Sequence, residues 1–274
     1  MKHSSFFSIA ISAILGISLA SCGGGGSTPL AAPTVLVPVG AEGLYTSTDP
    51  YGNRAATLIL DDGTFYSTYA TPSATTGFVW GKGEVSDSNK FSSNNVPFVF
   101  LKALNIQTGL ADYEYVATAS YFFGATFVKG QTLQSKISNK LNADDFIFTS
   151  NYEKSYEQSA KLADIAATYD GTMAVGSAVR LDFVPTLQTS TLTISAGGAL
   201  SGTVTGGCTF SGLLAPHVQG NAFNATVFFG DAPCPLPKTT VLGHAFVDPQ
   251  TKRLNVVTVM PDKTKGVLFS YAKK

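Results

Sequence analysis

Two histidines, His217 and His244, are the residues of this chain best suited to proton transfer or metal binding. They lie far apart in the sequence, and neither belongs to an H-x-x-x-H or H-x-H pair that would place two imidazoles on one metal ion. His217 follows a proline in an expected loop, whereas His244 falls in the middle of an expected strand. We therefore predict no metal site, and His244 is the better candidate for a general base.

The motifs that surround catalytic nucleophiles are missing from the sequence. No G-x-S-x-G elbow occurs, and Ser270 and Lys273 have S-x-x-K spacing without a following S-D-N or K-T-G segment. The acidic pairs Asp61-Asp62 and Asp144-Asp145 could transfer protons, but neighbouring residues of a strand point to opposite faces. We expect no catalytic activity and no cofactor. The alternative is a small-ligand carrier or a hydrolase whose site is built from dispersed residues.

Charge patterning argues against a nucleic-acid partner. The chain has 18 Lys+Arg and 18 Asp+Glu, and these charges are scattered singly rather than gathered into a basic stripe. No P-loop, G-x-G-x-x-G or EF-hand loop is present. The sequence therefore indicates neither a phosphate-backbone ligand nor a nucleotide.

The N-terminal segment has the pattern of a bacterial lipoprotein signal. A short basic start precedes an apolar run too short for a stable membrane span, and Leu19-Ala20-Ser21-Cys22 follows. By resemblance to bacterial lipoproteins, residues 1–21 form the signal peptide and Cys22 becomes the acylated N-terminus. Gly23 after that cysteine resembles outer-membrane sorting, facing either the periplasm or the cell surface. A plain secretory signal with a chance cysteine is the alternative.

Residues 22–41 are rich in glycine, then in proline, and have no apolar periodicity. They are expected to form a flexible lipidated tether. Cys208 and Cys234 remain as an even pair in an oxidising compartment, which favours a disulfide over two buried thiols. Such a bridge would stabilise the fold by roughly 3–4 kcal/mol in the chain-entropy model.

From residue 42 onward the dominant apolar period is two, which predicts an all-β protein. Asp62-Gly63 separates two strand-like runs, and Gly197-Gly198 separates two more. Many short strands with regular turns favour an antiparallel meander closed as small β-barrels or folded as a sandwich. The segment 159–167 has helical spacing, with Ser159 as the expected N-cap. We predict two related β units joined by this short helix, an N-terminal β domain at 42–157 and a C-terminal β-barrel domain at 158–274.

Three segments, 162–169, 207–212 and 230–234, resemble the C-terminal part of uncharacterised proteobacterial envelope lipoproteins, and Asp61-Asp62-Gly63-Thr64 resembles their first half. The strand order is also similar to barrels of the avidin, lipocalin and transferrin-binding-protein type. The resemblance implies an envelope lipoprotein with a barrel-like fold. It implies no activity and no ligand residues.

Aromatic residues crowd the first half of the chain, for example Phe78, Trp80 and Tyr121. We expect them to fill a core, and the alternative is an exposed or lumen-lining patch for a partner. The function predicted from sequence is a non-catalytic binding or interaction module anchored to the outer membrane, with a protein or small-ligand partner.

Overall fold

The computed structural model describes residues 40–72, 75–87, 89–100, 103–104, 111–112, 118–139, 145–177 and 186–274. The predicted signal peptide, Cys22 and nearly all of the predicted tether therefore lie outside the described residues, as does Asp144. No helix among the residues described is long and apolar enough to cross a membrane.

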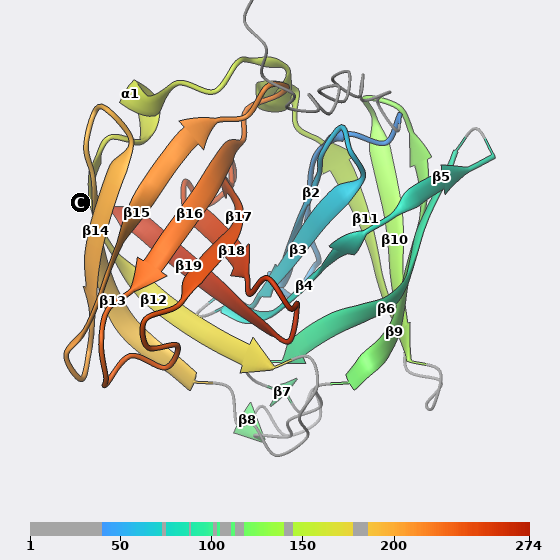
Figure 1. Ribbon diagram of the computed structural model, residues 1–274. Helices are drawn as coiled ribbons and strands as arrows, with labels where there is room; N and C mark the ends of the chain where they lie inside the picture. Colours follow the sequence, from blue (N-terminus) through green and yellow to red (C-terminus); the bar gives the residue numbers. More distant parts are fainter. Residues whose placement is uncertain are drawn as a thin grey trace, which may run out of the picture. The chain divides into compact units, whose positions relative to one another are not determined.

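The N-terminal half of the described chain forms an antiparallel sheet of nine strands in the order β4-β3-β2-β1-β11-β10-β9-β6-β5 (Figure 1). A further pairing joins β4, at one end of this order, to β6, which is next to the other end, so the sheet is barrel-like. The strands are β1 (Gly43–Thr48), β2 (Arg54–Ile59), β3 (Thr64–Ala70), β4 (Thr75–Lys82), β5 (Glu84–Ser86), β6 (Lys90–Phe100), β9 (Thr118–Val128), β10 (Thr132–Asn139) and β11 (Asp145–Tyr152). The short strands β7 (Ala103–Leu104) and β8 (Ala111–Asp112) pair with each other.

The C-terminal half forms a closed barrel in which each strand pairs with the next and the last pairs with the first (Figure 1). Its strands are β12 (Ala167–Ser177), β13 (Thr186–Ile194), β14 (Ala199–Val204), β15 (Cys208–Pro216), β16 (Phe223–Phe229), β17 (Thr240–Val247), β18 (Leu254–Val259) and β19 (Lys265–Lys273). The predicted all-β class with two barrel-like units is confirmed.

The period-two pattern explains the barrel locally. In β16, buried and exposed residues alternate without a break from Phe223 to Phe229, because successive strand residues point to opposite faces. The inward set packs into a core that contains Phe210, Phe229 and Phe269, so the barrel is filled by its own side chains.

The predicted Asp62-Gly63 turn of the N-terminal sheet is also present. Gly63 has φ +82°, a conformation that glycine adopts without strain.

The connection between the sheets contains a 3₁₀ turn, η1 (Lys154–Glu157), and one helical turn, α1 (Leu162–Ile165). The predicted helix is therefore present. The predicted N-cap is wrong: Lys161 holds that position, and no side chain caps the helix. Ser159 lies too far upstream, since the helix is only one turn long.

An apolar cluster contains residues of both sheets. Trp80 and Phe78 of β4 belong to it together with Val257 of β18 and Leu268 of β19. The described residues from Gly40 to Lys274 fall into one compact unit. The division into domains at 42–157 and 158–274 stays a prediction.

Candidate functional site

The outer face of strands β13, β14 and β15 carries a regular set of hydroxyl side chains. Thr191 of β13 lies opposite Thr203 of β14, which lies opposite Thr209 of β15. Exposed and buried residues alternate along these strands, so the hydroxyl groups point outward while Leu192 and Val204 point into the core. The Thr191 and Thr203 hydroxyls share a hydrogen bond of 2.9 Å.

A hollow of about 480 Å³ lies over this face. It is lined by Thr191, Thr193, Ser201, Gly202, Thr203, Thr209, Phe210, Ser211, Phe228 and Gly230. All of these lining residues are uncharged, and most of them carry hydroxyl groups. We call this feature the hydroxyl hollow. Hydroxyls both donate and accept hydrogen bonds, so the lining can match a neutral polar ligand in many orientations.

An aromatic ring borders the hydroxyl hollow. Phe228 of β16 lies opposite Ser211 and is 44% exposed, which is unusual for a phenylalanine. Leu213 and Leu242 lie on either side of Thr226 in the neighbouring row and are 50% and 55% exposed. The outer barrel face thus combines a polar hollow with an exposed apolar border, a combination typical of binding surfaces.

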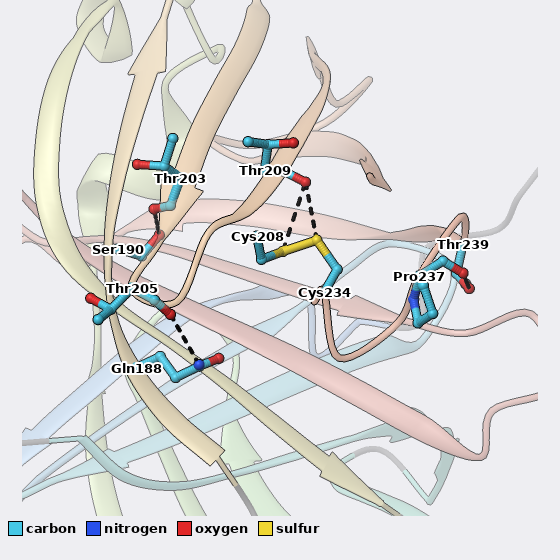
Figure 2. Close-up of a disulfide and its surroundings, with 9 residues drawn as sticks. All are labelled: Gln188, Ser190, Thr203, Thr205, Cys208, Thr209, Cys234, Pro237 and Thr239. Carbon is cyan, nitrogen blue, oxygen red and sulfur yellow. Dashed lines mark hydrogen bonds between the residues drawn. A yellow bond between two sulfur atoms is a disulfide. The ribbon is translucent and has the colours of Figure 1, made fainter. Parts of the chain in front are cut away.

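The predicted disulfide between Cys208 and Cys234 is present (Figure 2). It lies beside Thr209, a lining residue of the hydroxyl hollow. It joins the start of β15 to the loop between β16 and β17. Both sulfur atoms lie near the carbonyl oxygen of Thr209, at 3.7 and 3.3 Å, and the same oxygen accepts a 2.9 Å hydrogen bond from Gly230 N–H. Thr209 and Gly230 both line the hollow, so the bridge holds one of its edges in place.

Hydrogen bonds from side chains to backbone carbonyls connect β13 to its neighbour β14. The Ser190 hydroxyl donates to the Thr203 carbonyl at 2.9 Å, and the Gln188 amide donates to the Thr205 carbonyl at 3.2 Å (Figure 2). These contacts join β13 to β14 and to the turn that follows it. The hydroxyl groups of the hollow therefore lie on hydrogen-bonded strands rather than on a loop.

The structure brings together residues that the sequence analysis considered separately. His217 Nε2 lies 2.9 Å from Asp61 Oδ1, and His217 Nδ1 lies 2.7 Å from Asn224 Oδ1. His244 Nδ1 lies 3.0 Å from the Tyr66 hydroxyl. The two imidazole rings meet edge to face with centroids 5.4 Å apart. We call Asp61, Tyr66, His217 and His244 the histidine cluster.

Burial shifts the pKa of two members of this cluster, His244 and Tyr66. Asp61 is only 4% exposed and lies within hydrogen-bond distance of His217. Burial, followed by the nearby His217, lowers the pKa of His244 from 6.5 to about 4. Burial also raises the pKa of Tyr66. His244 is therefore neutral at pH 7 and can accept or donate a hydrogen bond to the tyrosine hydroxyl.

The histidine cluster differs from a nucleophile–base–acid arrangement. The hydroxyl partner of His244 is a tyrosine rather than a serine or threonine, and the carboxylate of Asp61 bonds to the other histidine. Among the described residues, no group of three or more His, Cys, Asp or Glu is placed to hold a metal ion. Asp62, the neighbour of Asp61, instead accepts hydrogen bonds from Thr64 in the predicted hairpin turn.

Sequence reasoning did not identify the hydroxyl hollow. The sequence does contain a pattern for it, because Thr189, Thr191 and Thr193 alternate with buried residues. That pattern is not specific, since threonine is a common residue on any exposed strand face. Only the cross-strand register shows that the outward hydroxyls of three strands form one surface. The predicted aromatic core is present in part, since Phe78 and Trp80 are buried.

No protein-family model matches this sequence, and no curated protein matches it either. Among solved structures, a mutant of transferrin binding protein B from Haemophilus parasuis is similar with a TM-score of 0.33 and 8% identity, over 82% of this chain and 67% of that one. The isotype 1 transferrin binding protein B from serogroup B Neisseria meningitidis is similar with a TM-score of 0.31 and 10% identity, over 91% of this chain and 54% of that one. The chain thus spans about half the length of the second protein.

Proposed function

We propose that this protein is a lipid-anchored, non-catalytic binding module of the cell envelope, and that its binding surface is the hydroxyl hollow. The observation that carries the proposal is an uncharged hollow of about 480 Å³, lined largely by hydroxyls and bordered by the exposed ring of Phe228. The filled barrel core supports it further, because a barrel packed with its own side chains offers its outer face rather than its interior to a ligand.

The lining favours a neutral ligand that is rich in hydroxyl groups, and a glycan chain has that chemistry. Threonine and serine hydroxyls can exchange hydrogen bonds with sugar hydroxyls, and the Phe228 ring offers an apolar surface for the C–H face of a sugar. A charged ligand would find no opposite charge among the lining residues. The hollow is also large enough for a ligand of that kind, since small-molecule sites begin at about 300 Å³.

The sequence supports the anchoring part of the proposal. The apolar run and Leu19-Ala20-Ser21-Cys22 resemble a lipoprotein signal. Several acyl chains at roughly 0.8 kcal/mol per buried CH₂ would hold the protein on the membrane effectively without release. The glycine-rich segment after Cys22 would then separate the sheets from the membrane surface.

Lipidation predicts a specific change at the N-terminus. We expect intact-protein mass spectrometry of membrane fractions to find a chain that begins at Cys22 and carries acyl groups. A Cys22→Ser variant should lose the lipid and leave the membrane fraction. An unmodified N-terminus on a freely secreted wild-type protein would contradict the anchoring proposal.

Binding is tested with a panel of neutral and charged oligosaccharides of matched length, presented to the lipid-free protein. We expect neutral members to bind and the Phe228→Ala variant to bind them more weakly. Leu187→Ala is a matched control, because Leu187 is an exposed apolar residue of β13 that does not line the hollow. Equal binding by both variants, or binding of charged glycans alone, would overturn the proposed site.

A further inference from the structure

A second hollow lies where strands of the two sheets meet, away from the hydroxyl hollow. It has a volume of about 30 Å³ and is lined by Arg54, Ala56, Thr68, Ala70, Asp248, Thr251, Arg253, Asn255 and Ser270. Two arginine residues therefore line one small space. The chain has only three arginines, Arg54, Arg180 and Arg253, so the pairing of two of them is notable in itself.

Arg54, which lines this hollow, carries an unpaired donor. Its Nε atom is buried, and nothing in the described part of the chain accepts a hydrogen bond from it. A buried N–H of a charged group without an acceptor is costly, and that cost is removed when an acceptor binds. The structure thus contains a donor for which a ligand could supply the acceptor.

Arg253 is held in place beside it. Its Nε donates to the Ser270 hydroxyl at 2.9 Å and its Nη2 donates to the Ser270 carbonyl at 2.6 Å, which leaves further N–H groups of the guanidinium available. Burial, followed by the nearby charge of Arg54, lowers the pKa of Arg253, and the carboxylate of Asp248 opposes this shift. The two cations are therefore close enough to repel each other.

The carboxylate of Asp248 only partly compensates these charges. Its Oδ1 accepts the Gln250 N–H at 2.9 Å and its Oδ2 accepts the Thr251 hydroxyl at 2.7 Å, so its hydrogen bonds serve its own loop. With two guanidinium groups and one carboxylate, the lining has a net positive charge. Asn255 adds a neutral amide to the lining.

We infer that the hollow between Arg54 and Arg253 binds a small oxyanion, of the size of a carboxylate group. The charge and the unpaired donor select an anion, and the planar guanidinium groups suit an acceptor with two oxygens. About 10–15 Å³ accommodates one water-sized group, so a hollow of about 30 Å³ accommodates two such oxygens. The site is independent of the hydroxyl hollow and of the function proposed for it.

NMR of the arginine side chains during anion titration tests this inference directly. In protein with ¹⁵N-labelled arginine, the Nε–H signals of Arg54 and Arg253 are recorded while acetate or phosphate is added, with chloride at matched ionic strength as the reference. We expect acetate, and not chloride, to shift both signals in a saturable way. An Arg54→Gln variant should bind acetate at least about tenfold more weakly.

Controls separate a site from a general charge effect. Lys252 is exposed in the adjoining loop and does not line the hollow, so Lys252→Gln should change acetate affinity less than about twofold. If Arg54→Gln fails to fold, Arg54→Lys keeps the charge, loses the planar fork and should still bind more weakly. Equal shifts of the Arg54 and Arg253 signals with chloride and with acetate, or unchanged affinity in the Arg54 variant that folds, would overturn the inference. Glucuronate added in place of acetate distinguishes the source: binding of both indicates a carboxylate carried on a larger molecule, and binding of acetate alone indicates a free ion.

Discussion

At the residue scale, the two histidines show that the contacts of a side chain cannot be predicted from its own sequence segment alone. From the sequence, His217 in a loop and His244 in a strand are both ordinary, and Asp61 belongs to a hairpin turn. The strand and the turn were predictable from local patterns. Their meeting was not, because Asp61 lies in the turn between β2 and β3, whereas His217 follows β15 and His244 lies in β17, and no local pattern encodes contacts between segments so far apart in the chain.

The histidine cluster predicts a pH dependence of stability. Because the pKa of His244 is about 4 in the folded protein and 6.5 as a free side chain, the unfolded chain binds more protons between these values. The stabilisation is complete above pH 6.5 and is lost as the pH falls toward 4. Its upper bound is about 3 kcal/mol. Urea unfolding at pH 7 and pH 4.5 should show this loss in the wild type and a smaller loss in His244→Gln.

A second variant tests what lowers the pKa of His244. His217 contributes to the lowered pKa of His244, so His217→Gln should raise the His244 pKa toward 6.5, as followed by NMR of the imidazole ring. An unchanged His244 pKa in this variant would show that the two rings do not interact in solution. Equal pH dependence of wild type and His244→Gln would contradict the assigned burial.

At the scale of elements, strands were predicted better than helix ends. The period-two pattern that predicts strands is uninterrupted in β16, where buried and exposed residues alternate from Phe223 to Phe229. The helix N-cap was misplaced, because a single turn such as Leu162–Ile165 gives little periodic signal. Pairing partners of the barrel strands follow the chain order, and this is the simplest topology that a meander allows.

The disulfide predicts both a stability and a binding effect. Replacing Cys208 and Cys234 together with alanine should lower the free energy of unfolding by about 3 kcal/mol, for the 26-residue separation of the two cysteines. The same change frees the segment that carries Thr209 and Gly230, so glycan binding should weaken in protein that remains folded. Urea unfolding measures the first effect. A double variant as stable as the wild type would contradict it.

At the scale of the whole molecule, the two sheets are expected to unfold together. Trp80 is the only tryptophan of the chain and belongs to the apolar cluster that contains residues of both sheets. A Cβ atom at Gly266 of β19 would lie 2.7 Å from the Trp80 ring, which leaves no room for a methyl group. The sequence could not reveal this packing, because a glycine within a strand has several explanations.

This close approach makes a specific variant informative. Gly266→Ala should destabilise the protein by roughly 1–3 kcal/mol through overpacking, and Trp80 fluorescence should report the change during urea unfolding. Gly197→Ala is the matched control, because the nearest atom to its Cβ is the Ser195 hydroxyl oxygen at 3.9 Å. Equal stability of the two variants would show that Trp80 and Gly266 are not in contact in solution.

The proposed binding function is tested most directly by removing one hydroxyl. Thr203→Val keeps the side-chain shape in the centre of the hydroxyl hollow and deletes its hydrogen bonds, whereas Thr226→Val makes the same change on the outer face beyond the lining. In calorimetric titration with a neutral oligosaccharide that binds the wild type, Thr203→Val should weaken affinity about 3- to 10-fold, and Thr226→Val should leave it unchanged. Equal affinities of the two variants, or a larger loss in Thr226→Val, would contradict binding through the hydroxyl hollow.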